Sequence, residues 1–218
     1  MEIVSQEQLD REVSEWAGIE DFRSASSDGR HLRRAANRNG VIDACVSLFV
    51  EGNNWPTVAE VAERAGVSER SIFRYFDDVE ELTRSAVESC VREAVPFALL
   101  PTPRPEDLGE RIDAIVEARA KLFEHVAPIS SVARVHIAHN KLVGETYRKV
   151  RSYLRQQLIL VFGEELTALG NEGDDVLASL SIVLSFDTWF SLRSEDQLTV
   201  DETKRILRLM TRRIFALN

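Results

Sequence analysis

The sequence predicts an all-α fold, and three observations support this prediction. Apolar residues recur at spacings of three to four through most of the 218 residues, as on one face of a helix. Strictly alternating patterns, which predict strands, are nearly absent. Residues that cap helices precede several of the periodic stretches. The apolar share of 44% is enough to build a core, so we expect a globular chain and not a disordered one.

The composition also predicts the cellular setting. Cys45 and Cys90 each lie in an apolar helical pattern and form no CxxC pair, so we expect buried, reduced thiols. The N-terminus is acidic and lacks the basic-then-apolar order of a secretory signal. No run of about eighteen apolar residues predicts a membrane span. We therefore expect a soluble cytoplasmic protein that binds no membrane.

The first two helices of the predicted N-terminal part have clear boundaries. One is expected over about residues 32–51, where an apolar stripe ends at Gly52. The next begins at Thr57, because Thr57 and Glu60 have the spacing of a capping box, in which each side chain binds the other residue's backbone N–H. It ends at Gly66, which can adopt the positive φ of a tight turn.

The third helix is short, over residues 68–75, with Ser68 as its cap. With the preceding helix it fits a helix-turn-helix, in which two helices approach closely at a steep angle. Ala62 is the small residue at that approach, Gly66 forms the turn, and Ile72 faces inward. A plain corner between two helices is the alternative interpretation.

A fourth helix is predicted over about residues 79–95, where Asp78 and Glu81 form the cap and Pro96 closes the helix. Three prolines at positions 101, 103 and 105 separate this part from a longer helical part. The helices of that part are expected at about residues 106–125, 128–142, 145–169, 174–193 and 200–217.

The net charge of −9 argues against DNA as a partner, because phosphates are bound by Lys and Arg, but the charge is unevenly distributed. Residues 1–29 carry eight acidic side chains and two arginines. Residues 30–76 carry seven arginines and five acidic side chains, and this segment alone is positive. It coincides with the helix-turn-helix, which favours a nucleic-acid partner.

Residues 57–82 closely resemble the DNA-binding region of the TetR family of regulators. The aromatic pair Tyr75-Phe76 and the acid-capped helix after it are typical of that family. Two positions depart from the pattern: Val79 stands where family members commonly have a lysine, and Phe73 where many have a tyrosine. The resemblance implies a three-helix DNA-binding head, a C-terminal helical domain that binds an inducer and dimerises, and usually repression.

We therefore expect three segments. Residues 1–29 form an N-terminal extension, residues 30–78 the helix-turn-helix DNA-binding domain, and residues 79–218 the helical effector-binding and dimerisation domain. In the extension, Leu9, Val13 and Trp16 recur at helical spacing. A docked amphipathic helix and a mostly disordered segment both remain open there.

Outward side chains of the short third helix are the candidates for base recognition. Arg70 and Arg74 can each bind a guanine through two nitrogens, and Ser71 is a secondary candidate. Glu69 either accepts from a cytosine amine or stabilises the helix N-terminus, and we prefer the second. The remaining candidates for DNA binding are Arg33, Arg34, Thr57, Ser68 and Tyr75.

A basic arm precedes these helices, formed by Arg30, Arg33, Arg34 and Arg38. It either follows the DNA backbone and reaches the minor groove or is only a solvated helix start. Both interpretations remain open.

The last two predicted helices are expected to form a homodimer. Between Val176 and Leu192 the only charged residue is Asp187, and apolar residues lie on two faces of the predicted helix. One face fits the chain's own core and the other a partner chain, to which the final helix contributes in a four-helix interface. Burial of both faces within one chain is the alternative. A dimer also suits double-stranded DNA with a palindromic operator.

The expected ligand is a small-molecule inducer, which the sequence does not identify. Its candidate contacts combine aromatic surface with a few polar groups, and they are His136, His139, Tyr147, Phe186, Asp187 and Trp189. Ordinary core or surface roles are the alternative for the histidines, and pairing with an arginine of the last helix is the alternative for Asp187. We expect no metal site, because no cysteine or paired carboxylate joins the histidines, and no cofactor.

These observations predict a sequence-specific DNA-binding transcriptional regulator, a ligand-responsive repressor that acts as a homodimer. The sequence contains no GxSxG, GxGxxG, GxxxxGK or HExxH motif, so we do not predict an enzyme. The alternative is a helical adaptor that has lost DNA binding and acts through protein contacts. The acidic net charge and the absence of the lysine at position 79 leave that alternative open.

Overall fold

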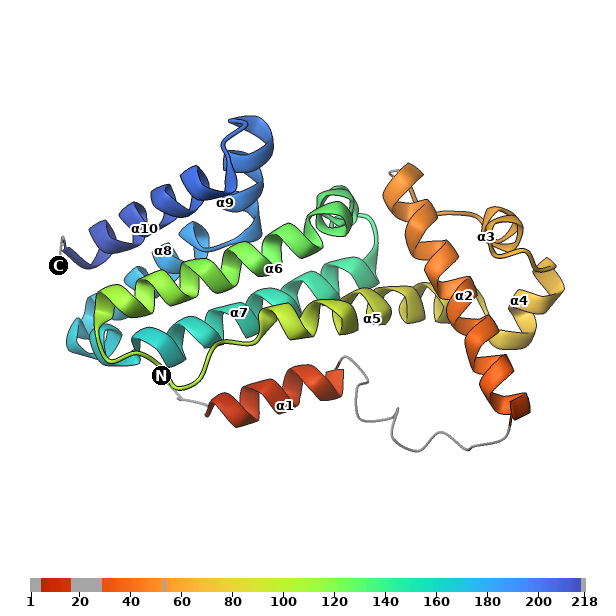
Figure 1. The fold of residues 1–218 in the computed structure, drawn as a ribbon, viewed down its shortest axis with the longest axis horizontal. Coiled ribbons are helices and arrows are strands. Elements are labelled where there is room, and N and C mark those ends of the chain that lie inside the picture. The colour runs from red at the N-terminus through yellow and green to blue at the C-terminus, as the bar shows by residue number, and fades with distance from the viewer. Residues whose placement is uncertain (1–4, 17–28, 53, 217–218) are drawn as a thin grey trace. The chain divides into compact units, whose positions relative to one another are not determined.

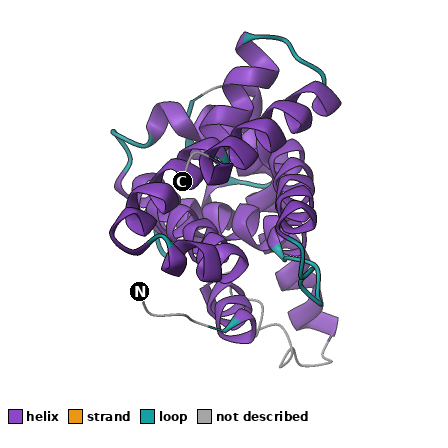
Figure 2. Cartoon of the chain, turned by 90° about the vertical axis from the view of Figure 1, so that its left-hand side faces the viewer, coloured by secondary structure: helices purple, strands orange, loops and turns teal. Residues whose placement is uncertain are grey.

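The computed structural model describes residues 5–16, 29–52 and 54–216, without the side chains of residues 16 and 29–33. Every regular element in these ranges is helical, which confirms the predicted all-α fold (Figure 1, Figure 2). The elements are α1 (Gln6–Trp16), α2 (Gly29–Gly52), α3 (Val58–Ala65), α4 (Glu69–Tyr75), α5 (Val79–Ala98), α6 (Leu108–His136), α7 (Lys141–Ala168), η2 (Gly170–Glu172), α8 (Gly173–Val183), α9 (Phe186–Phe190), η3 (Ser191–Glu195) and α10 (Val200–Ala216).

The chain forms two compact units. The first, which we call the N-terminal unit, consists of Ser14–Val95 and Pro128–Thr146. The second, which we call the C-terminal unit, consists of Met1–Val13, Pro96–Ala127 and Tyr147–Asn218. Each unit buries its own set of apolar side chains.

The predicted caps of the N-terminal unit are present. The backbone N–H of Glu60 donates to Oγ1 of Thr57 at 3.3 Å, and the backbone N–H of Thr57 donates to Oε2 of Glu60 at 2.7 Å. Oγ of Ser68 accepts from the backbone N–H of Ser71 at 3.2 Å. These bonds satisfy backbone donors that a helix start leaves unpaired, so they fix where α3 and α4 begin.

The turn between α3 and α4 depends on Gly66. Its φ is +67°, in the left-handed region that side chains with a Cβ rarely adopt. Its backbone N–H donates to Glu63 at 3.2 Å, and the next N–H donates to the carbonyl of Ala62 at 3.0 Å. This arrangement ends α3 and turns the chain into α4.

Replacing Gly66 by alanine is expected to destabilise the protein by about 1–2 kcal/mol, because the cost comes from the positive φ. No atom lies within 4 Å of an added Cβ at this position, so steric overlap adds nothing. Gly40 is the control: it lies inside α2 with equally open space, and alanine there is expected to stabilise by about 0.5–1 kcal/mol. Urea unfolding of both variants measures the difference, and equal changes would contradict this account of the turn.

The core of the N-terminal unit is formed by side chains of four helices, α2, α3, α4 and α5. Its buried side chains include Cys45 of α2, Val61 of α3 and Ile72 of α4, with exposures of 1% each. Phe76, directly after α4, is also 1% exposed. Burial raises the pKa of the Cys45 thiol to about 11, so this cysteine stays protonated and packs as a small apolar residue. The inward face of α4 is thereby fixed.

The C-terminal unit is built mainly from α6, α7, α8 and α10. Helix α8 packs against α10 within the chain. Ion pairs connect α6 to α10: Asp113 binds Arg208 at 3.2 Å and Arg212 at 3.1 Å, and Glu117 binds Lys204 at 3.2 Å. These pairs are partly exposed and contribute modest stability, but they favour one alignment of the two helices.

Two prolines do not act as predicted. Helix α5 continues through Pro96, and α6 continues through Pro128, so the boundaries predicted at these residues are wrong. A proline inside a helix removes one backbone hydrogen bond, and burial of its neighbours can offset that loss. Val95 and Ala98, on either side of Pro96, are both buried.

The single helix predicted over residues 174–193 is interrupted at Ser185. Ser185 has an extended backbone, and its Oγ accepts from the backbone N–H of Thr188 at 3.2 Å, which starts α9. The interruption changes which side chains share a face. Trp189 is 1% exposed, whereas Ile182, which lies seven positions earlier and would share its face in one continuous helix, is 62% exposed.

The segment Gly170–Glu195 is long and apolar enough, by composition, to cross a membrane. In the structure it is divided among η2, α8, α9 and η3. Leu177, Leu180 and Trp189 of this segment are buried in the C-terminal unit. These features are those of a core segment of a globular domain.

Candidate nucleic-acid interface

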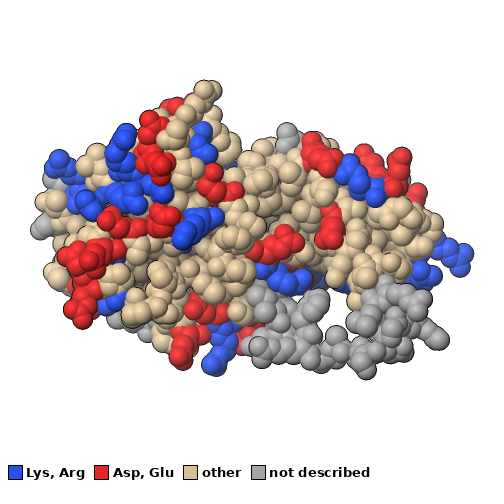
Figure 3. Space-filling model, in the orientation of Figure 1, with Lys and Arg blue, Asp and Glu red and all other residues tan. Residues whose placement is uncertain are grey.

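Helix α4 presents one face to the core and another to solvent. Ile72 is 1% exposed, whereas Arg70 and Arg74 are exposed and Phe73 is 50% exposed. Residues 70, 73 and 74 lie on one side of a helix because they are three and four positions apart. Basic side chains are visible at the end of the N-terminal unit where α4 lies (Figure 3). The predicted outward direction of Arg70 and Arg74 is therefore observed.

Arg70 is free to bind a ligand, because no hydrogen bond or ion pair joins it to any residue in the described part of the chain. Ser71 is different. Its hydroxyl lies 2.9 Å from that of Ser68, and its backbone N–H donates to the same residue. These bonds hold both serines at the start of α4, so Arg70 is better placed than Ser71 to reach outward.

A polar cluster joins the end of α4 to α2, with the Tyr75 hydroxyl at its centre. The hydroxyl accepts from Nη2 of Arg74 at 3.2 Å and from Nδ2 of Asn37 at 3.3 Å. Nη2 of Arg34 donates to the backbone carbonyl of Arg74 at 3.2 Å. The bond from Arg74, then that from Asn37, and the nearby charges of Arg74 and Arg34 lower the pKa of Tyr75. The cluster concentrates donors and positive charge, which is the chemistry that binds phosphate.

The predicted basic arm is not uniform. Arg38 is held by its own domain, since its Nη2 donates to Oγ of Ser85 at 2.8 Å and its guanidinium lies 4.6 Å from the ring centroid of Phe76. Arg34 is exposed beside α4. The side chains of Arg30 and Arg33 lie outside the described residues. Of these four arginines, Arg34 therefore lies at the candidate interface, whereas Arg38 is bound to Ser85 and Phe76 of its own unit.

Two residues of the interface were not among the sequence candidates. Asn37 binds Tyr75 across 38 positions of sequence, a contact that no local pattern indicates. Phe73 was noted only as a departure from the family pattern, yet it is a large exposed apolar side chain on α4. An aromatic residue there can contact thymine methyl groups in a major groove.

The effector candidates are not all brought together. Tyr147 donates from its hydroxyl to Oδ2 of Asp187 at 2.6 Å, and Phe186 directly precedes Asp187 in the chain. Burial, and then the bond to Asp187, raise the pKa of Tyr147. Trp189 is buried and donates from Nε1 to Glu124 at 3.0 Å. Of the six effector candidates, the structure therefore joins Tyr147 and Asp187 directly, with Phe186 adjacent to Asp187 in sequence.

The two histidine candidates belong to the N-terminal unit, whereas the other four lie in the C-terminal unit. The ring of His136 lies 5.3 Å from that of Phe49, centroid to centroid. His139 is exposed in the turn after α6. In the described part of the chain, no group of three or more His, Cys, Asp or Glu residues is arranged to hold a metal ion.

Comparison with known proteins agrees with this geometry. Residues 41–86, which include α3, the turn and α4, match the family model for bacterial regulatory proteins of the tetR family. The biofilm operon icaADBC HTH-type negative transcriptional regulator IcaR of Staphylococcus epidermidis is 22% identical over 166 residues. That alignment covers 73% of this chain and 85% of the relative.

Solved structures show the same fold at low identity. A transcriptional regulator from Rhodococcus sp. Rha1 aligns with a TM-score of 0.64 and 19% identity, covering 82% of this chain and 96% of that one. A structure named as a putative TetR-family transcriptional regulator from Mesorhizobium loti MAFF303099 aligns with a TM-score of 0.64 and 16% identity, covering 85% of this chain and 98% of that one. The likeness extends over both units of the chain.

Proposed function

We propose that this chain, which belongs to the TetR family of bacterial regulatory proteins, is a homodimeric repressor released from its operator by a small molecule. Membership of that family makes it a DNA-binding transcriptional regulator and not an enzyme. Repression is supported by the similar regulator IcaR, whose name describes a negative regulator. The protein acts in the cytoplasm, where the chromosome of a bacterium lies.

The observation that carries the proposal is the exposed face of α4. Arg70 and Arg74 point away from the core, and the rest of α4 is fixed by burial of Ile72. In a helix-turn-helix the second helix enters the major groove, where an arginine binds the O6 and N7 atoms of guanine. We assign base recognition to Arg70 and Arg74, with Ser71 in a minor role.

Phosphate contacts are assigned to side chains that flank α4. Tyr75 and Arg34 are supported by their place in the polar cluster beside α4. Thr57 and Ser68 lie at the N-termini of α3 and α4, where backbone N–H groups favour anions. Arg33 remains an expectation from the sequence.

Dimerisation is assigned to α8 and α10. Three large apolar side chains on these helices are exposed: Ile182 at 62%, Leu209 at 55% and Met210 at 38%. Apolar surface on two adjacent helices suits a two-fold, self-complementary interface. Two copies would place two recognition helices on one palindromic operator.

The effector is proposed to bind in the C-terminal unit. The hydrogen-bonded pair Tyr147 and Asp187, with Phe186 beside it, offers both polar groups and aromatic surface. Trp189 and the histidines His136 and His139 remain sequence-based candidates. Ligand binding is expected to lower operator affinity by changing the separation of the two recognition helices.

A mobility-shift experiment tests the proposal. The DNA is the region upstream of the protein's own gene, and binding is measured at 50 mM and 200 mM salt beside a random fragment. We expect a specific complex whose affinity falls by about 10³-fold or more between these salt concentrations if six or more phosphates are contacted. The absence of any specific shift would contradict the proposal and favour an adaptor that acts through protein contacts.

A further inference from the structure

Phe73 is a large apolar side chain that the N-terminal unit leaves uncovered. It lies on α4 and is 50% exposed, whereas Ile72 before it and Phe76 after the helix are each 1% exposed. In the part of the chain that the structure describes, no aromatic ring or cation lies against the Phe73 ring. Burial of apolar surface is favourable, so we expect an apolar group to cover this ring in a complex.

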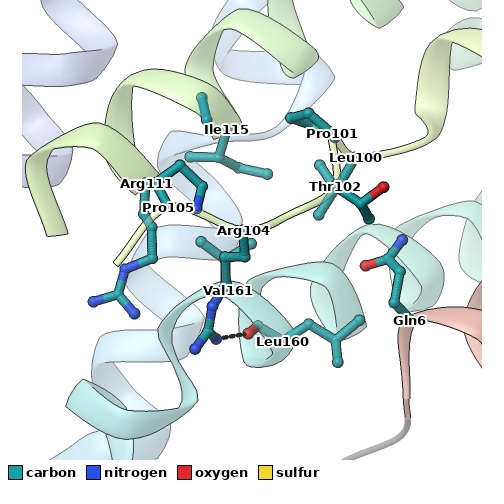
Figure 4. A pocket seen from close by; sticks show the side chains of 11 residues that line it. Gln6, Leu100, Pro101, Thr102, Arg104, Pro105, Arg111, Ile115, Leu160 and Val161 are labelled. Atoms are coloured by element: carbon teal, nitrogen blue, oxygen red, sulfur yellow. Dashed lines mark hydrogen bonds between the residues drawn. The ribbon is translucent and has the colours of Figure 1, made fainter. Parts of the chain in front are cut away.

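The cavity of about 230 Å³ in the C-terminal unit is different, because the arginines that line it are paired within the chain (Figure 4). Arg104 donates to Glu164 at 3.0 Å and also to the backbone carbonyl of Leu160. Arg111 pairs with Glu165. The ring on α4 has no such partner, so it is the stronger indication of a group supplied from outside the chain.

Phe73 lies at the edge of the outward face of α4. Successive residues of an α-helix are about 100° apart around the helix axis. Arg70 and Arg74 are therefore each about 160° from the buried Ile72, whereas Phe73 is only about 100° from it. Along the axis, Phe73 lies about 4.5 Å beyond Arg70 and about 1.5 Å before Arg74. When the two arginines point into a groove, the ring therefore points toward one wall of that groove.

The edge that carries Phe73 is unsuited to bind the phosphate backbone. Phe73 has no hydroxyl and donates no hydrogen bond. Glu69, four residues earlier on the same edge, is exposed and carries a negative charge that phosphates repel. Ser71 lies on the opposite edge, and its hydroxyl is 2.9 Å from that of Ser68. The edge with Phe73 is therefore suited to base edges and not to phosphates.

The major groove offers an apolar group that fits this ring, the C5 methyl of thymine. The other groups that the four bases expose in this groove for recognition are hydrogen-bond donors and acceptors. The methyl projects from the side of the thymine ring that faces its own strand, and so from the wall of the groove. Its position and chemistry match those of the uncovered ring on α4.

We propose that Phe73 recognises the C5 methyl group of a thymine in each half-site, beside the bases assigned to Arg70 and Arg74. This inference rests on the proposed function, because it requires α4 to enter the major groove of an operator. The contact distinguishes thymine from a pyrimidine without the methyl, which hydrogen bonds to the thymine O4 atom do not do. It also accepts 5-methylcytosine, which carries a methyl group at the same ring position.

The test uses the operator fragment from the mobility-shift experiment, synthesised either with thymidine triphosphate or with deoxyuridine triphosphate. Uracil keeps the base pairing of thymine and removes only the methyl group. Loss of one buried methyl corresponds to about fourfold in affinity, so loss at both half-sites is expected to weaken binding about tenfold or more. Fluorescence anisotropy of the full-length protein with both fragments, at one salt concentration, measures this ratio.

Phe73→Ala is expected to bind the thymine fragment more weakly than the wild type and to bind the two fragments equally. The side chain is half exposed, so its removal is expected to leave the fold intact, which thermal unfolding checks. Val135→Ala is the matched control, because Val135 is an exposed apolar residue of the same unit on α6. This control is expected to keep the full difference between the fragments.

Single uracil substitutions in synthetic duplexes then locate the thymine. At that position, a pair containing 5-methylcytosine is expected to bind about fourfold more tightly than the same pair with cytosine. Phe73→Ala is expected to bind these two duplexes equally.

Equal binding of the wild type to the thymine and uracil fragments would overturn the inference and leave the proposed repressor standing. A difference that persists in Phe73→Ala would also overturn it, because the methyl groups would then act through another side chain or through the shape of the DNA. A protein that binds neither fragment specifically would contradict the proposed function, and this inference with it.

Discussion

Replacing Arg70 by alanine is expected to weaken binding to the cognate operator by about 1–3 kcal/mol, roughly 5- to 150-fold. The side chain is exposed on α4, and no described residue competes for its guanidinium. A base contact of this kind contributes only on the correct sequence, so the loss on random DNA is expected to be much smaller. Fluorescence anisotropy with both DNA fragments at one salt concentration measures the difference.

The matched control is Arg84→Ala. Arg84 is an exposed arginine of the same unit, on α5 and not on α4, and it pairs with Glu80 at 3.1 Å. Its removal lowers the net charge equally and is expected to change both affinities by the same small factor. Equal losses on operator and random DNA in Arg70→Ala would reassign Arg70 to phosphate binding. No loss on either fragment would remove it from the interface.

The double variant Ile182→Glu, Leu209→Glu is expected to be monomeric and to lose about a hundredfold or more in operator affinity. Both side chains are exposed apolar groups on α8 and α10, and a charge at each would be buried without a partner in the proposed dimer. A monomer engages one half-site and loses the benefit of linked binding, which amounts to roughly 10²- to 10⁴-fold. Light scattering after size exclusion gives the mass, and anisotropy gives the affinity.

Val135→Glu is the control for this variant. Val135 lies on α6 and is 70% exposed, so it is an apolar surface residue outside the proposed interface. It is expected to stay dimeric and to bind the operator normally. A dimer that persists in the double variant would show that α8 and α10 do not form the interface.

The helix-turn-helix was predictable because its determinants are local. The capping box of Thr57 and Glu60 lies within four residues, and the positive φ of Gly66 follows from the lack of a Cβ. The cap at Ser68 and the inward position of Ile72 depend on the same short range. Each of these interactions involves residues within about four positions of one another, so the local sequence pattern is sufficient to predict where the helices begin and end.

The missed features depend on packing between distant segments. The continuation of helices through Pro96 and Pro128 is decided by tertiary burial, which outweighs a single lost hydrogen bond. The contact of Asn37 with Tyr75 joins two helices and has no local signal. The interruption at Ser185 arises because a serine can cap a new helix as readily as it continues an old one.

The spacing of the two outward arginines on α4 has a consequence for the operator itself. Arg70 and Arg74 are four residues apart, which corresponds to a rise of about 6 Å along the helix. Successive base pairs are stacked about 3.4 Å apart, so the two guanidiniums span roughly two steps of the duplex. If both arginines bind bases as proposed and α4 lies along the groove, we expect a half-site with two guanines at about that interval, and the matching pair in its mirror copy.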